Sequence, residues 1–381
     1  MNTRSLVVTT GFALFAMFFG SGNLVFPLLV GTESQGHYLL SSFGIILTGV
    51  LVPFMGVLAI LLYKGDTREF LGTMGRPAKF WFPLIALSLM GPFGVLARCI
   101  TVAHGSFTLL FPSCTLIPFS LAFCGIIFLL TANKNRIIPF LGSTLTPFLL
   151  VALLAIISAG IWNAEVKAPE GSHVLSAFRT GALQGYQTMD LLAAFFFSTF
   201  IIQHLTQKFS SDDEPQALVK VFLKSAFIGG SLLSIVYCGL VYLGSAYAVQ
   251  LNDVPPQAML GVVSQNTLGV FSAPIVCVTV VLACFTTAVV LTSLFADFFR
   301  QEVSKNFINV PVSLGVTLGI AFGVSTLEFS GIAAFLAPIL ETLYPALIVL
   351  TLVNITNKLW GAKLRRWPVI LTFMAKISSL V

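Results

Sequence analysis

The sequence predicts an all-α, polytopic membrane protein, and three observations support that fold class. Charged residues make up only 9% of the 381 residues and hydrophobic residues 57%, whereas roughly 25% of an ordinary soluble domain is charged. Long apolar stretches follow one another along the chain, with short loops between them. The Lys and Arg residues gather in alternate loops. These features exclude a soluble enzyme, a disordered chain and a nucleic-acid-binding protein, and they make membrane lipid the expected surroundings.

Ten stretches are apolar enough to cross a bilayer, which takes about 20 residues of helix. They lie near residues 5–30, 39–63, 80–111, 116–132, 138–162, 182–205, 221–249, 270–298, 311–327 and 331–353. A shorter apolar stretch after Trp367 predicts a partial eleventh helix. The chain therefore divides into residues 1–162 with five helices, residues 182–353 with five more, and residues 354–381 with a cytoplasmic loop and the partial helix.

The basic residues predict which side of the membrane each loop faces, because cytoplasmic loops collect Lys and Arg. Of the 20 Lys and Arg residues, 16 lie at the N-terminus or in loops of one side, and only Lys167 and Arg179 lie in loops of the other. We therefore expect a multi-pass protein of the cell inner (plasma) membrane with a cytoplasmic N-terminus. The loops 31–38, 112–115, 163–181 and 250–269 are expected outside, the last with a short surface helix. Five spans per half would insert the second half upside down, as in inverted-repeat transporters.

The first span is interrupted in its middle by Gly20, Ser21, Gly22 and Asn23. Glycine weakens a helix interior by roughly 1 kcal/mol relative to alanine, and Ser and Asn side chains compete for backbone hydrogen bonds. Unwound backbone at this depth is tolerated where it lines a cavity or is buried in protein. The interruption therefore predicts a ligand site, the alternative being close helix packing.

The sixth span begins the second half, and its first part is polar. That part contains Gly185, Gln187, Thr188 and Asp190, and a clean apolar run follows. Paired broken helices meet at the membrane midplane in inverted-repeat transporters. The sixth span is therefore expected to break as the first one does.

Three ionisable residues, Arg98, Asp190 and Glu341, fall well within predicted spans. A charge at a helix centre costs roughly 2.5–3.5 kcal/mol on insertion scales, so each is a candidate functional group. A structural ion pair between Arg98 and one of the acids is the alternative, and it would leave the other acid to be explained. Asp190 lies beside the expected break. Glu341 lies between two prolines, an arrangement that would suit a cation site, a proton-binding site or a bend in the helix.

A pair of hydroxyls, Thr286 and Thr287, lies in the middle of the eighth span. Most threonines in membrane helices bond back to a carbonyl of their own helix. A cation site built from oxygens could instead combine these hydroxyls with free carbonyls of the unwound first span. Both interpretations are open at the level of sequence.

Four segments in this order resemble the branched-chain amino acid:cation symporters, the LIVCS or BrnQ family. They are FFGSGNLVFP at 18–27, GPFGVLARCITV at 91–102, GYQTMDLLAAFFF at 185–197 and ACFTTAVVLT at 283–292. The resemblance implies a LeuT-type 5+5 inverted repeat with broken first and sixth transmembrane helices. Two departures stand out: family members usually have twelve spans, and Ala97 and Cys99 flank Arg98 where Pro and Thr are expected.

The resemblance also implies roles for individual residues. Residues that match substrate-binding positions, the first four through their backbone N–H groups, are Gly20, Ser21, Gly22, Asn23, Thr188, Met189 and Asp190. Residues that match a sodium site, the first two through their carbonyls, are Ala16, Phe19, Thr286 and Thr287.

The implied function is secondary active import of Leu, Ile and Val by sodium symport through alternating access. Sodium would be the coupling ion, no other cofactor is expected, and a monomer would be sufficient. The alternative is a proton-coupled symporter of neutral amino acids that uses Asp190 or Glu341. We expect no enzyme, because neither G-x-S-x-G with a partner His nor H-E-x-x-H occurs in the chain.

Overall fold

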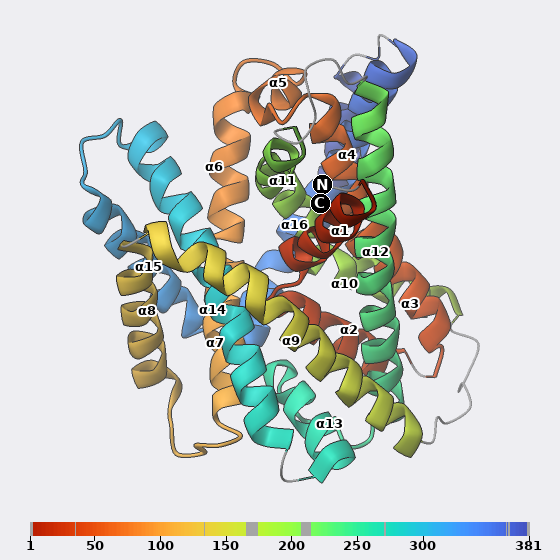
Figure 1. Ribbon diagram of the computed structural model, residues 1–381, viewed down its shortest axis with the longest axis vertical. Helices are drawn as coiled ribbons and strands as arrows, with labels where there is room; N and C mark the ends of the chain where they lie inside the picture. Colours follow the sequence, from red (N-terminus) through yellow and green to blue (C-terminus); the bar gives the residue numbers. More distant parts are fainter. Residues whose placement is uncertain are drawn as a thin grey trace.

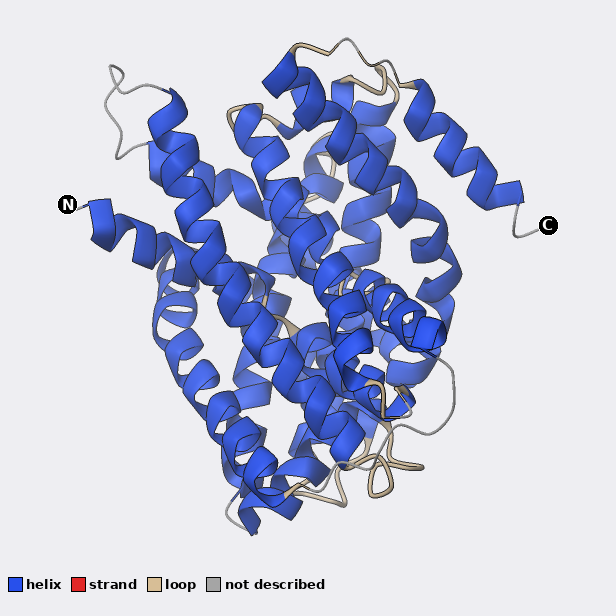
Figure 2. Ribbon diagram, turned by 90° about the vertical axis from the view of Figure 1, so that its right-hand side faces the viewer, coloured by secondary structure: helices blue, strands red, loops and turns tan. Residues whose placement is uncertain are grey.

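The computed structural model describes residues 3–34, 36–132, 134–164, 174–206, 215–269, 272–362, 364 and 366–378. Over these residues the chain is a bundle of helices, seen from two sides in Figures 1 and 2, and the described part contains no strand. A helix satisfies its own backbone hydrogen bonds, which is the condition for entering lipid. The all-α fold class predicted from composition is therefore confirmed.

Each of the ten predicted spans coincides with a helix or with consecutive helices. Six spans are single helices: α8 (Leu116–Ala132), α9 (Lys134–Asn163), α12 (Pro215–Ala246), α14 (Ser272–Phe298), α15 (Val310–Ser325) and α16 (Glu328–Trp360). The others are α1 (Thr3–Phe18) with α2 (Ser21–Glu33); α3 (Tyr38–Ile46), a π-helical turn (Leu47–Leu51) and α4 (Val52–Leu62); α6 (Ala78–Met90) with α7 (Val95–Phe107); and α10 (Val174–Gln187) with α11 (Asp190–Thr206). The shorter helices are α5 (Thr67–Gly72), a 3-10 turn (Pro256–Ala258), α13 (Met259–Leu268), a π-helical turn (Phe299–Val303) and α17 (Trp367–Ser378).

Length and apolarity alone support fewer crossings than the sequence predicts. Among the described residues, five helical stretches are long and apolar enough to cross a membrane, and the bent pair α1 and α2 makes six. The remaining predicted spans are short apolar helices such as α8 and α15, or the interrupted pair α10 and α11. The multi-pass character is thus secure, whereas the count of ten stays a prediction.

Two of the expected outer loops contain helix. The helix expected within 250–269 is α13, which packs against α9 and α14 and buries Met259, Leu260 and Val263. The prediction of a loop over 163–181 is wrong for its second part, because α10 already begins at Val174. Some of the basic residues that predict the membrane orientation lie outside the described residues; they are Lys167, Lys208, Lys363 and Arg365.

The first span breaks where predicted, and α1 and α2 meet at an angle of 73°. Gly20 between them is extended, with φ −121° and ψ −168°. The backbone N–H of Gly20 donates to Asn23 Oδ1 at 3.3 Å, and the backbone N–H of Asn23 donates to the Gly20 carbonyl at 3.2 Å. Asn23 thus reaches back over its own helix start, as the third residue of a capping box does.

The sixth span also breaks, between α10 and α11. Met189 at the break has a φ of +60°, a left-handed conformation that is uncommon for residues other than glycine. The broken pairs pack on each other, α2 against α10 and α1 against α11, and both parts of the first pair contact α12. Figure 1 shows these four short helices in the middle of the bundle. The packing brings the two breaks together.

Close contact between α3 and α10 depends on two glycines. A Cβ on Gly181 would overlap the carbonyl oxygen of Ser41, and a Cβ on Gly44 would overlap that of Phe178. Since overpacking typically costs about 1–3 kcal/mol, we expect Gly181→Ala to lower the melting temperature of the purified protein in detergent. Gly319→Ala is the control, because nothing lies within 4 Å of its added Cβ. Equal melting temperatures for both variants would contradict this account of the helix contact.

Candidate functional site

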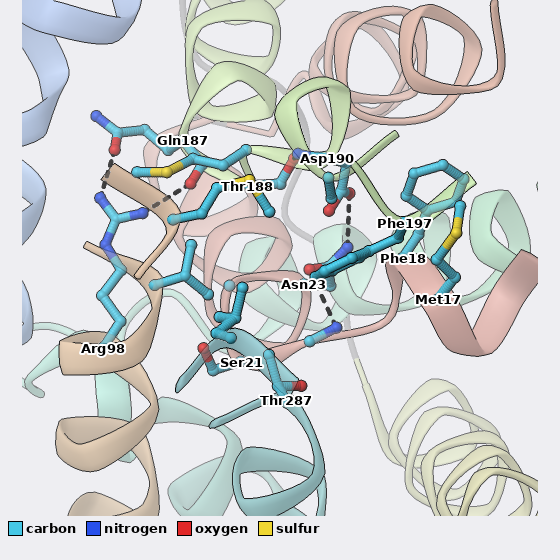
Figure 3. A pocket seen from close by; sticks show the side chains of 17 residues that line it. Met17, Phe18, Ser21, Asn23, Arg98, Gln187, Thr188, Asp190, Phe197 and Thr287 are labelled. Atoms are coloured by element: carbon cyan, nitrogen blue, oxygen red, sulfur yellow. Dashed lines mark hydrogen bonds between the residues drawn. The ribbon is translucent and has the colours of Figure 1, made fainter. Parts of the chain in front are cut away.

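A cavity lies where the two broken helix pairs meet, and Figure 3 shows it from close by. The empty space between its lining atoms, open solvent included, amounts to about 450 Å³. Its lining consists of Met17, Phe18, Gly20, Ser21, Gly22, Asn23, Met90, Val95, Arg98, Gln187, Thr188, Met189, Asp190, Ala193, Phe197, Thr287 and Leu291. All the residues that the sequence analysis associates with substrate are in this set. The tertiary structure therefore brings both predicted breaks to one cavity.

A buried hydrogen-bond network holds Asp190 at the start of α11. Asn23 Nδ2 donates to Asp190 Oδ2 at 2.8 Å and to the Tyr237 hydroxyl oxygen at 2.6 Å. The Tyr237 hydroxyl lies 3.3 Å from the same carboxylate oxygen and donates to it. Asp190 is 3% exposed and Tyr237 is fully buried. The network links α2, α11 and α12 and places a carboxylate in the cavity wall.

Arg98 on α7 supplies a buried positive charge in the same wall. Its Nη1 donates to the Gln187 carbonyl at 2.7 Å and its Nη2 to Gln187 Oε1 at 2.6 Å. The guanidinium carbon lies 4.9 Å from the centre of the Phe26 ring and 5.6 Å from that of Phe329. Within the described part of the chain, Arg98 forms no ion pair with an acid. The structural ion pair weighed in the sequence analysis is therefore absent there.

The start of α2 presents unpaired backbone donors to the cavity. The first N–H groups of an α-helix have no partner inside the helix, and the helix dipole makes this end attractive to anions. Ser21 and Gly22 occupy the first positions of α2, and both line the cavity. This end of the site suits a small anion such as a carboxylate.

Of the four residues assigned to sodium by resemblance, Thr287 lines the cavity, whereas Ala16, Phe19 and Thr286 do not. A Cβ on Gly20 would lie 3.6 Å from Thr287 Oγ1, so the hydroxyl faces the break in the first span. Both threonine hydroxyls donate to the Ala283 carbonyl, at 2.8 Å from Thr286 and 3.2 Å from Thr287. Donation leaves their oxygen lone pairs free to face a cation.

The two carbonyls of that set lie at the end of α1. In a continuous helix the Gly20 and Asn23 amides would donate to the carbonyls of Ala16 and Phe19. Here these amides donate to Asn23 Oδ1 and to the Gly20 carbonyl. The break thus releases both carbonyls from their usual helical donors. Among the described residues, no group of three or more His, Cys, Asp or Glu side chains could hold a metal.

Sequence reasoning missed several residues of the site. Gln187 was noted only as part of a polar stretch, and Tyr237 was not noted because a single tyrosine in an apolar span carries no local signal. The apolar wall of the cavity also depends on packing, and it contains Met17, Phe18, Met90, Val95, Ala193, Phe197 and Leu291. Glu341, in contrast, is a half-buried residue of α16 outside the cavity lining.

The arrangement of the helices is that of the LeuT-type fold. The chain is similar to the solved structure titled "Inward facing conformation of Mhp1", with a TM-score of 0.66, 15% identity, and coverage of 92% of this chain and 77% of that one. It is also similar to MhsT in complex with L-phenylalanine, with a TM-score of 0.52, 15% identity, and coverage of 95% and 98%. At such identity the likeness shows the fold alone. The predicted LeuT-type architecture is therefore confirmed.

The family follows from a match over nearly the whole chain. The family model described as "Branched-chain amino acid transport protein" matches residues 3–381, and the chain belongs to that family. A branched-chain amino acid permease BrnQ of Corynebacterium glutamicum is 29% identical over 361 residues, covering 94% of this chain and 82% of the relative. The branched-chain amino acid transport system 3 carrier protein of Pseudomonas aeruginosa is 28% identical over 376 residues, covering 97% and 85%. The resemblance drawn from four segments is confirmed, and the family is one of transport proteins.

Proposed function

We propose that this protein imports the branched-chain amino acids Leu, Ile and Val across the bacterial inner membrane by sodium symport. The observation that carries the proposal is the cavity at the two helix breaks, whose lining combines the charged side chains of Arg98 and Asp190 with apolar side chains. The names of its bacterial relatives, branched-chain amino acid permease and carrier protein, support the substrate class.

The substrate would place each of its parts against matching chemistry. Its carboxylate would lie at the start of α2, near the amides of Ser21 and Gly22, and its ammonium group near Asp190. Its side chain would lie on the apolar wall, where burial of a Leu-sized group is worth about 1.5–3 kcal/mol. Since one methylene discriminates by only about 1–3 kcal/mol, we expect overlapping use of the three substrates.

Sodium would bind between the end of α1 and the middle of α14. Its ligands would be the carbonyls of Ala16 and Phe19 and the hydroxyls of Thr286 and Thr287. Movement of one sodium ion down about 100 mV releases about 2.3 kcal/mol, and a tenfold gradient adds about 1.4 kcal/mol. The sum of about 3.7 kcal/mol could sustain an accumulation of several hundred-fold.

Alternating access would proceed by movement of the two halves, residues 1–162 and 182–353, around this cavity. Each half contributes one broken pair and one partner of the proposed sodium site, so an ion there would favour one arrangement of the halves. The cavity is built from one chain, which supports a functional monomer. The excess of basic residues in alternate loops supports a cytoplasmic N-terminus.

The test is uptake of labelled leucine into proteoliposomes with and without an inward sodium gradient. We expect sodium-stimulated uptake that unlabelled Val and Ile inhibit and Lys does not. Liposomes without protein and liposomes with equal sodium on both sides are the controls. Failure of the folded protein to take up leucine under either condition would contradict the proposed substrate.

A proton-coupled mechanism is the second candidate, because Asp190 is a buried acid in the cavity wall. In that case a pH gradient would drive uptake without sodium, and Asp190→Asn would remove the response. Glu341 is the weaker proton carrier in this structure because it lies outside the cavity lining. Imposing each gradient separately distinguishes the two mechanisms.

A further inference from the structure

Arg98 is a buried cation in the cavity wall whose hydrogen-bond capacity is only partly used. Its side chain is 1% exposed, and a guanidinium has five N–H donors and a permanent charge. The two bonds to Gln187 leave donors free, and Nε has no hydrogen-bond partner. A buried charge without a counter-ion is strongly destabilising. The absence of an acid partner in the described part of the chain therefore calls for an anion from outside.

Because Nη1 and Nη2 both bond to Gln187, the edge of the guanidinium that carries Nε is left as the place for that anion. Phe26 and Phe329 lie against the group at 4.9 and 5.6 Å. Aromatic rings attract a cation but supply no negative charge. A carboxylate can accept two parallel hydrogen bonds from the planar edge, which gives both strength and orientation.

Arg98 and the start of α2 share neighbouring residues. A Cβ on Gly22 would lie 3.3 Å from the Phe26 ring that contacts the guanidinium, and 3.6 Å from the Cα of Thr188, the residue after Gln187. Asp190 also lines the cavity, yet its hydrogen bonds go to the neutral side chains of Asn23 and Tyr237. Figure 3 shows Arg98 at the left of the view and Asp190 to its right, with Thr188 between them. The cavity lining therefore contains two buried charges of opposite sign, and each has its own neutral hydrogen-bond partners.

We propose that Arg98 binds the α-carboxylate of the substrate and is the residue that makes the carrier select a free carboxylate. The inference rests on the proposed function, since it assumes an α-amino acid in this cavity. A zwitterion would neutralise both ends of the site: its carboxylate at Arg98 and the first turn of α2, and its ammonium at Asp190. While the site is empty, the neutral side-chain amide of Gln187 holds Arg98 and that of Asn23 holds Asp190.

The test compares leucine with leucinamide, which lacks the carboxylate, as competitors for binding of labelled leucine to the purified full-length protein. The wild type should prefer leucine by at least about 100-fold, because a site built for a polar group strongly rejects an analogue without it. Arg98→Gln should weaken leucine binding by about 30-fold or more and leave leucinamide binding little changed, so that the preference falls below about fivefold. Arg98→Lys, which keeps the charge but not the planar edge, should show an intermediate preference.

Arg179→Gln is the matched control, because Arg179 is an exposed arginine on α10. It should leave both affinities and their ratio unchanged. A residue that merely supports the fold would weaken leucine and leucinamide equally, so an unchanged ratio in Arg98→Gln and Arg98→Lys would overturn the inference. Absence of leucine binding by the wild type would instead contradict the proposed function itself.

Discussion

Thr287→Ala is expected to abolish the stimulation of leucine uptake by sodium. The Thr287 hydroxyl faces the break in the first span, with its oxygen 3.6 Å from where a Cβ of Gly20 would lie. Loss of one of the few oxygens in an ion site should weaken sodium binding at least about tenfold, or by about 1.4 kcal/mol, so that sodium concentrations that stimulate the wild type leave the variant unstimulated. Initial uptake rates across a series of sodium concentrations measure this change.

Two further variants control the interpretation of that result. Thr287→Ser keeps the oxygen and should retain sodium stimulation. Thr292→Ala removes a hydroxyl that is buried in the same helix and outside the cavity lining, and it should behave as the wild type does. Unchanged sodium dependence in Thr287→Ala would remove this residue from the coupling site.

Asp190→Asn is expected to weaken leucine binding by about 100-fold, or about 2.7 kcal/mol. The variant keeps the shape of the side chain and removes the charge that would face the substrate ammonium group. Loss of one partner of a buried, hydrogen-bonded charge pair typically costs about 2–5 kcal/mol. Equilibrium binding gives the affinity, and uptake at saturating leucine gives the remaining coupling.

The same variant separates the two coupling ions. Under sodium coupling, the residual uptake of Asp190→Asn stays sodium-stimulated, whereas under proton coupling the response to a pH gradient disappears. Glu341→Gln is the control, since Glu341 is an acid within a span but outside the cavity lining, and it should retain near wild-type affinity. If Asp190→Asn kept wild-type affinity and coupling, Asp190 would be neither the partner of the substrate ammonium group nor the proton carrier.

The break in the first span was predictable because its cause is local. Four residues that disfavour a helix interior follow one another in an apolar stretch, and Gly20 and Asn23 form the interruption largely through bonds to each other. The break in the sixth span was less evident from sequence. The residue at that break is Met189, which adopts a positive φ that nothing in its side chain favours.

Arg98 marks the point where sequence reasoning was insufficient. The sequence shows an expensive charge in a span, and pairing with an acid was one explanation. The structure instead gives it Gln187, a neutral residue 89 positions away. Whether a buried charge finds an acid, an amide or a ligand depends on which helix faces it, and no local pattern contains that information.

The sequence by itself determined the membrane environment, the helical fold class, the place of the first break and the family. These properties follow from composition, apolar length and short motifs, all of which act within one helix or are recognisable segment by segment. Only the tertiary structure decided that α7, α11 and α14 meet α2 around one cavity. It also decided that Asp190 bonds to Tyr237 of α12, while Arg98 bonds to no acid among the described residues. Those partners come from helices far apart in the chain, and their meeting is set by how side chains of neighbouring helices pack, which a linear pattern does not specify.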